Sequence, residues 1–68
     1  MTDEEILTPG LLKFPNGGEI NVHSLSSIAD DGEVYYARRM PQSTEWDCMR
    51  TSVRRFLRGV RRAEGYRG

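Results

Sequence analysis

Hydrophobic positions near the C-terminus recur with the period of an α-helix. Between Thr44 and Gly65 the apolar residues follow one another at alternating steps of three and four, namely Trp46, Met49, Val53, Phe56, Val60 and Ala63. This spacing places them on one face of a helix. Thr44 is positioned to cap the first turn together with Asp47, and Gly65 to end the helix in a left-handed conformation. The pattern predicts a helix over residues 44–64 with its apolar face in the core.

The same steps are those of a coiled-coil heptad, which makes a coiled-coil dimer the alternative. The apolar seam covers fewer than three heptads, however, whereas a coiled coil needs about three or four. Trp46 and Phe56 also suit the surface of a sheet better than a two-stranded seam. We therefore expect this helix to lie across a sheet.

Two apolar runs on either side of a glycine-rich turn predict a β-hairpin over residues 11–22. A three-residue loop over residues 16–18 aligns the apolar residues of both strands on one face, with Phe14 opposite Ile20. A two-residue loop would place them opposite polar residues instead. Gly18 is expected to supply the left-handed conformation that such a loop needs.

A further strand and a short helix are predicted after the hairpin. Residues 33–40 alternate between two faces, as a strand does, and Pro41 ends the run. Residues 24–31 carry apolar residues at helical spacing, with a serine before them and Gly32 after them, which predicts a short connecting helix.

The two ends of the chain predict little regular structure. Thr2 and Glu5 have capping-box spacing, which predicts a single helical turn that frays within residues 1–10. Residues 66–68 are expected to form a loose tail.

Together these elements predict an α+β fold in a single small domain over residues 1–68. A three-stranded antiparallel sheet occupies residues 11–40, with the short connecting helix beside it and the long amphipathic C-terminal helix packed on it. The expected core consists of Trp46, Met49, Val53, Phe56, Val60, Phe14, Ile20 and Val22.

A chain of 68 residues is near the lower size limit for a domain that folds alone. Its one cysteine cannot form an internal disulfide, so a homodimer is a plausible further source of stability. No apolar stretch has the length of a membrane span. The sequence therefore predicts a cytoplasmic protein that binds no membrane.

The charges cancel overall but are sorted along the chain. Residues 1–33 carry seven acidic residues against one lysine, about −6, and residues 34–68 carry nine arginines against three acidic residues, about +6. Fields depend on local charge, so a zero sum is compatible with a strongly basic face. The choice of arginine matters because its planar guanidinium suits phosphate, carboxylate and aromatic partners.

On the predicted C-terminal helix the arginines gather opposite the apolar seam. They are Arg54, Arg55, Arg58, Arg61 and Arg62. Like charges at such spacing destabilise an isolated helix, and a polyanion or an acidic partner would relieve that repulsion. The alternative is a solvated helix face whose counter-charge comes from the acidic N-terminal half.

Residues 35–39 interleave tyrosine and arginine, as single-stranded nucleic-acid platforms do. Tyr35, Arg38 and Arg39 are therefore further candidates for a binding face. The alternative is that one tyrosine packs inward while the other lies on the surface. No nucleic-acid-binding consensus supports this interpretation further, and a pI near 6.6 argues against a dedicated non-specific DNA binder.

Candidate enzymatic chemistry is weak. His23 is the only histidine, and nothing in the sequence places it beside a nucleophile or a second metal ligand. Cys48 is expected to be an inert thiol. The glycine-rich turn lacks the lysine pattern of a phosphate-binding loop. We therefore expect no enzyme, no metal and no cofactor.

The chain is similar in size and style to the accessory proteins encoded by bacteriophages, although no motif carries that similarity. Three functions are compatible with the sequence. The first is a binding module whose arginine helix engages nucleic acid or a nucleoprotein complex. The second is a phage-type regulator or inhibitor that binds an acidic surface of a host protein. The third is a structural subunit of an assembly.

Overall fold

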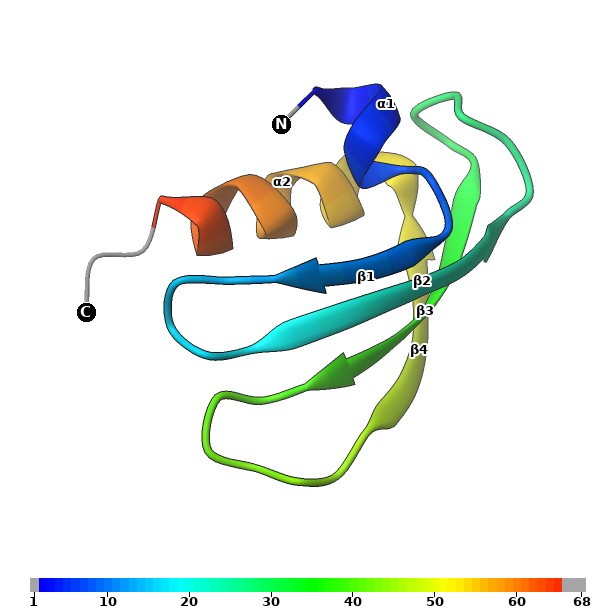
Figure 1. Ribbon diagram of the computed structural model, residues 1–68. Helices are drawn as coiled ribbons and strands as arrows, with labels where there is room; N and C mark the ends of the chain where they lie inside the picture. The colour runs from blue at the N-terminus through cyan, green and yellow to red at the C-terminus, as the bar shows by residue number, and fades with distance from the viewer. Residues whose placement is uncertain (1, 66–68) are drawn as a thin grey trace.

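Four antiparallel strands form one sheet, and two helices cover one of its faces (Figure 1). The structure is a computed structural model, and it describes residues 2–65. Its elements are α1 (Asp3–Ile6), β1 (Gly10–Lys13), β2 (Glu19–Leu25), β3 (Glu33–Arg39), β4 (Asp47–Ser52) and α2 (Val53–Glu64). The strands lie in the order β1-β2-β3-β4, so each pairs with its neighbour in the sequence. The α+β class is confirmed, and the expected tail at residues 66–68 lies outside the described residues.

The prediction of one helix over residues 44–64 is wrong for its first part. Residues 47–52 form β4, which pairs with β3 and places Met49 opposite Tyr36. Pairing with β3 gives this segment interstrand hydrogen bonds that depend on a partner distant in the sequence, so the local helical spacing does not decide its structure. The helix α2 begins after Ser52, whose hydroxyl accepts a hydrogen bond from the Arg55 amide at 3.2 Å. It ends at Gly65 with φ −82°, so the predicted left-handed ending is also wrong.

The predicted connecting helix over residues 24–31 is absent. β2 continues to Leu25, and Ser26 then pairs with Glu33, through an amide-to-carbonyl bond of 2.9 Å, to close the β2–β3 connection. Ile28 points to solvent with 79% of its surface exposed. A helix here would therefore have no core against which to bury its apolar residues. The loop instead caps α2, because the carbonyl of Gly32 accepts from the Val53 amide at 2.8 Å.

The β1–β2 hairpin forms with a register two residues away from the predicted one. Leu12 lies opposite Ile20, and the loop consists of residues 15–17. Pro15 suits the first loop position because its φ is fixed and it has no amide to pair. Gly17, and not Gly18, adopts the positive φ of +91°. A shift of two residues leaves side chains on their original faces, so the apolar face is still formed as predicted.

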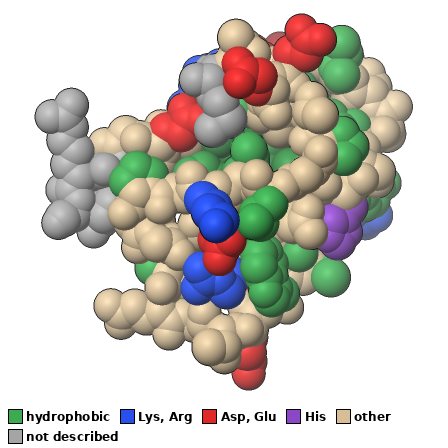
Figure 2. All heavy atoms as spheres, in the orientation of Figure 1, with side chains coloured by type: hydrophobic (Ala, Val, Ile, Leu, Met, Phe, Trp, Pro, Cys, Tyr) green, Lys and Arg blue, Asp and Glu red, His purple; other side chains and the backbone are tan. Residues whose placement is uncertain are grey.

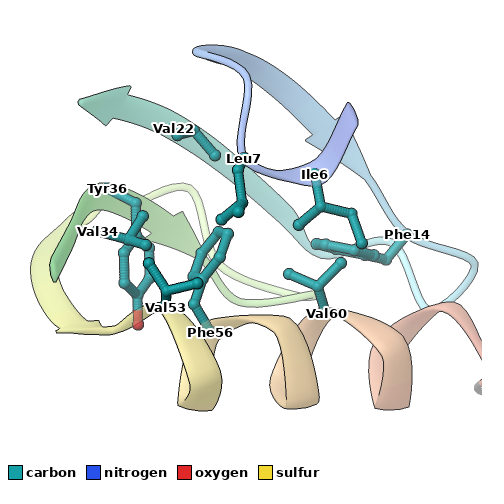
Figure 3. Close-up of a cluster of buried hydrophobic side chains, with 9 residues drawn as sticks. All are labelled: Ile6, Leu7, Phe14, Val22, Val34, Tyr36, Val53, Phe56 and Val60. Atoms are coloured by element: carbon teal, nitrogen blue, oxygen red, sulfur yellow. The ribbon is translucent and has the colours of Figure 1, made fainter. Parts of the chain in front are cut away.

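The core is one cluster built from both helices and from three of the strands or their ends (Figure 3). It consists of Ile6, Leu7, Phe14, Val22, Val34, Tyr36, Val53, Phe56 and Val60. Figure 3 shows Ile6, Phe14 and Val60 pointing toward one another at one end of this cluster. At the other end the rings of Tyr36 and Phe56 lie 4.9 Å apart, centroid to centroid, at a tilt of 55°.

The predicted core is only partly correct. Val53, Phe56, Val60, Phe14 and Val22 are buried as predicted, whereas Met49 and Ile20 are only partly buried at the edge of the cluster. Trp46 is 44% exposed, because it precedes β4 and does not lie on a helix.

The N-terminal turn is docked against the core, contrary to the frayed turn expected from the sequence. Ile6 is fully buried and Leu7 is 7% exposed. The predicted capping box is confirmed: the Thr2 hydroxyl accepts from the Glu5 amide, and the Thr2 amide donates to the Glu5 carboxylate. The Thr2 hydroxyl also donates to Oε1 of Glu5 at 3.1 Å, and the bonds that this carboxylate accepts from the Thr2 amide and hydroxyl lower the pKa of Glu5. Local capping and burial of Ile6 thus stabilise the same short helix.

Replacing Phe56 by alanine should cost about 3 to 5 kcal/mol of unfolding free energy, because it empties the centre of a very small core. Trp46→Ala should cost much less, since that side chain is half exposed. Urea unfolding followed by circular dichroism measures both. Equal losses for the two variants would contradict the assignment of residues 44–52 outside the helix.

Candidate functional site

Five arginines cover the outward side of α2, which we call the arginine face: Arg54, Arg55, Arg58, Arg61 and Arg62. All five are exposed, whereas Phe56 and Val60 on the opposite side are buried. At about 100° per residue the five side chains fall within roughly one third of the helix circumference. The arginine grouping predicted from the sequence is therefore present on a 12-residue helix.

The two margins of the arginine face have different neighbours. At one margin Arg61 forms an ion pair with Asp3 of α1. Both side chains are about half exposed, so this pair contributes little to stability. At the other margin Arg55 borders a cleft between α2 and the sheet. Between these margins, Arg54, Arg58 and Arg62 form no ion pair with a carboxylate of residues 2–65.

The candidates on β3 are separated by the alternation of the strand. Arg38 lies on the face that the helices cover, together with Tyr36. Tyr35 and Arg39 lie on the outer face, and Tyr35 is 38% exposed. The structure therefore does not combine these residues into one aromatic and basic platform. One tyrosine packs inward and the other lies on the surface, which is the alternative considered from the sequence.

Arg39 is a structural residue. Its Nε and Nη2 donate to Oε1 of Glu19 at 3.0 and 2.6 Å. Its Nη2 also donates to the carbonyl of Gly17 at 2.7 Å, and its Nη1 to the carbonyl of Ser43 at 2.8 Å. One guanidinium thus joins the β1–β2 turn to the β3–β4 loop, and its donors are occupied. Arg39 therefore has no free guanidinium donor for a ligand.

The outer face of the sheet carries mixed charge. Lys13, Glu19 and Arg39 lie side by side across β1, β2 and β3. Figure 2 shows basic and acidic side chains next to one another at the centre of this view, beside hydrophobic side chains. Because opposite charges alternate here, the outer face has no concentrated positive field.

The cleft beside α2 is a feature that the sequence analysis missed. It has a volume of about 290 Å³ and lies between α2, the covered face of the sheet and the two hairpin ends, with α2 residues from Arg55 to Ala63 along its wall. Arg38 and Arg55 both line it. No pattern in the sequence places Arg38 beside α2, because their approach depends on how the helix crosses the sheet. The only local feature in the sequence that could have indicated this cleft is Gly59, a glycine in the interior of the helix.

The residues weighed for enzymatic chemistry are not brought together. His23 lies at an irregularity in β2 and is exposed, and Cys48 is exposed on β4. Within residues 2–65 no group of three His, Cys, Asp or Glu side chains is arranged to hold a metal ion. No helix in the same range is long and apolar enough to cross a membrane.

Comparison with known proteins gives no relative from which a function could be transferred. The chain has no significant match among protein-family models, curated proteins or solved structures. Its function is therefore inferred from its own residues and their arrangement.

Replacing Arg39 by glutamine should lower the free energy of unfolding by about 2 kcal/mol, because the charged guanidinium donates to four acceptors: the Glu19 carboxylate and the carbonyls of Gly17, Met40 and Ser43. Arg50→Gln is the matched control: the side chain of Arg50 is 71% exposed and lies 3.8 Å from Glu33. Its loss should stay within about 0.5 kcal/mol. Chemical denaturation measures both, and an unchanged midpoint for Arg39→Gln would contradict the structural role.

Proposed function

We propose that this protein is a small non-enzymatic binding module whose arginine face engages nucleic acid or a nucleoprotein complex. The observation that carries this proposal is the grouping of five exposed arginines on one side of α2, of which only Arg61 has an ion-pair partner within residues 2–65. Guanidinium groups bind phosphate oxygens with two parallel hydrogen bonds. Phosphate contacts of this kind supply most of the affinity in sequence-independent binding.

The length of the arginine face fits a short stretch of phosphate backbone. From Arg54 to Arg62 the helix rises about 12 Å, at about 1.5 Å per residue. Phosphates of one DNA strand are spaced about 3.4 Å apart along the duplex axis. A single helix of this length therefore reaches a few phosphates of one strand.

Acidic groups limit the footprint at both ends of the face. Asp3 lies beside Arg61 near the second half of α2. At the first turn, the carbonyl of Asp30 accepts from the amide of Arg54 at 3.2 Å, which brings the acidic β2–β3 loop close. A polyanion that extended past either end would meet the Asp3 carboxylate or the acidic β2–β3 loop. The proposed interaction is therefore local, and it does not require a basic protein overall.

A second candidate is a regulator or inhibitor that binds an acidic surface of another protein, in the manner of phage proteins directed at host machinery. It is favoured by exposed aromatic residues away from α2, namely Trp46 and Tyr35. Such residues are frequent in the energetically important parts of protein interfaces. A structural subunit of an assembly is a third candidate, in which the oppositely charged parts of two copies meet.

Replacing Arg54, Arg58, Arg61 and Arg62 by glutamine should preserve the fold, because glutamine has a similar helix propensity and the apolar side of α2 is unchanged. Binding to mixed-sequence duplex DNA should fall sharply. In the parent, four phosphate contacts with a duplex give a slope of log affinity against log salt of about −3.6, which the variant should flatten. Fluorescence anisotropy across a salt series measures the slope.

The control for this experiment is the double variant Lys13→Gln and Arg50→Gln, which removes two basic side chains outside the arginine face. It should retain most of the affinity. A quadruple variant that binds DNA as tightly as the parent would refute the proposal. A parent that binds acidic proteins from solution but no nucleic acid would favour the second candidate.

A homodimer also stays a prediction. A core of nine buried residues without a disulfide is small for a stable monomer, so self-association would add stability. The unfolding midpoint should then rise with protein concentration. Sedimentation equilibrium that shows a monomer, with a midpoint independent of concentration, would contradict this expectation.

A further inference from the structure

The cleft beside α2 lies where three parts of the chain meet. Figure 1 shows the β1–β2 turn, the β3–β4 loop and the C-terminal end of α2 at the same side of the molecule. Phe14, Ile20 and Val60 contribute apolar surface to the cleft, and Arg39 joins the two loops at its rim. Because Arg39 hydrogen-bonds to both loops, they are held at a fixed position at the rim of the cleft.

The charges that line the cleft leave a positive surplus. Three arginines and one glutamate border it: Arg38, Arg39, Arg55 and Glu19. Arg39 and Glu19 neutralise each other at 2.6 Å, which leaves Arg38 and Arg55 without a partner among the described carboxylates. The net charge of the lining is therefore +2.

Arg38 has a donor that lacks an acceptor. Its Nε is buried and has no hydrogen-bond partner within residues 2–65. Asp47, opposite it on β4, is exposed and forms no ion pair with it. A buried charged donor without a partner is unfavourable unless an acceptor is supplied from elsewhere. This Nε is closed to solvent, so an anion in the cleft would be attracted by the positive charge of the Arg38 guanidinium and would not bond to Nε itself.

Gly59 is a second, independent indication that the cleft holds a ligand. Glycine in the interior of a helix lowers helix stability relative to alanine. A Cβ atom added at Gly59 would meet nothing within 4 Å, so no packing contact within the described residues requires glycine there. Gly59 lines the cleft, and the absence of a side chain lets a ligand approach the helix backbone closely.

We propose that this cleft binds one nucleotide of a single-stranded nucleic acid, with Arg38 and Arg55 on its phosphate and its base against the apolar lining. This inference rests on the proposed function and names the form of nucleic acid. A volume of about 290 Å³ lies near the lower limit of small-molecule sites, which suits one nucleotide. A carboxylate side chain would satisfy a guanidinium but leave the apolar lining uncovered. Bases in a duplex are stacked and could not enter.

The test compares a short labelled single strand of deoxythymidine with a duplex, using anisotropy at fixed salt. Arg38→Gln removes one cleft charge, and Gly59→Gln adds a side chain to the cleft lining while it improves helix propensity. Each should weaken single-strand binding about tenfold and leave duplex binding unchanged. Arg62→Gln is the control on the arginine face outside the cleft, and should weaken both probes equally. Gly59→Gln should also raise the thermal midpoint, which shows that any loss is not unfolding.

The outcomes separate this inference from the proposed function. If the quadruple arginine variant loses binding while Arg38→Gln and Gly59→Gln bind the single strand like the parent, the cleft inference is overturned and the proposed function stands. If the parent binds neither probe, the proposed function fails, and the cleft inference fails with it. If a glutamate-rich peptide binds through Arg38 and the single strand does not, the cleft takes carboxylates and the inference is overturned.

Discussion

Burial of the apolar side of α2 against the sheet is the interaction on which the rest of this structure depends. Val53, Phe56 and Val60 supply a third of the nine-residue buried cluster, which they share with residues from β2, β3 and the N-terminal turn. In so small a chain there is no second core to hold a loosened element. Every element therefore packs on the same cluster, β1 and β4 through the partly buried Leu12 and Met49.

This constraint also determines where charge can lie. Since one side of α2 is needed in the core, its arginines have to point outward, and nearly all of them stay unpaired with described carboxylates. The acidic N-terminal half neutralises the chain as a whole but meets the arginine face only at its margins. A concentrated positive surface is thus compatible with zero net charge because like charges are held together by a helix.

Arginine performs three different tasks in this protein, and burial decides among them. The guanidinium donors of Arg39 are hydrogen-bonded to acceptors in two loops, which they join. Arg38, its neighbour, points to the other face of the sheet and retains a buried donor without an acceptor. The arginine face of α2 is solvated. The proposed nucleic-acid binding uses the second and third kinds, in which the positive charge is still available to a ligand.

The sequence by itself determined the elements whose pattern is local. The apolar side of α2 with its opposed arginines, the Thr2–Glu5 capping box and the shared apolar face of β1 and β2 all follow from short-range spacing. It also identified Arg54, Arg55, Arg58, Arg61 and Arg62 as one group, because their grouping needs only the helical period.

Only the tertiary structure decided the remaining features. Residues 47–52 have helical spacing, yet they form β4 because β3 offers a ladder of backbone hydrogen bonds that no local pattern reveals. The β2–β3 segment does not form the predicted helix, because Ile28 has no core to pack against. The carbonyls of this segment instead accept hydrogen bonds from the first amides of α2. The cleft of Arg38, Arg55 and Gly59 joins residues that are separated in sequence, so it exists only once α2 crosses the sheet.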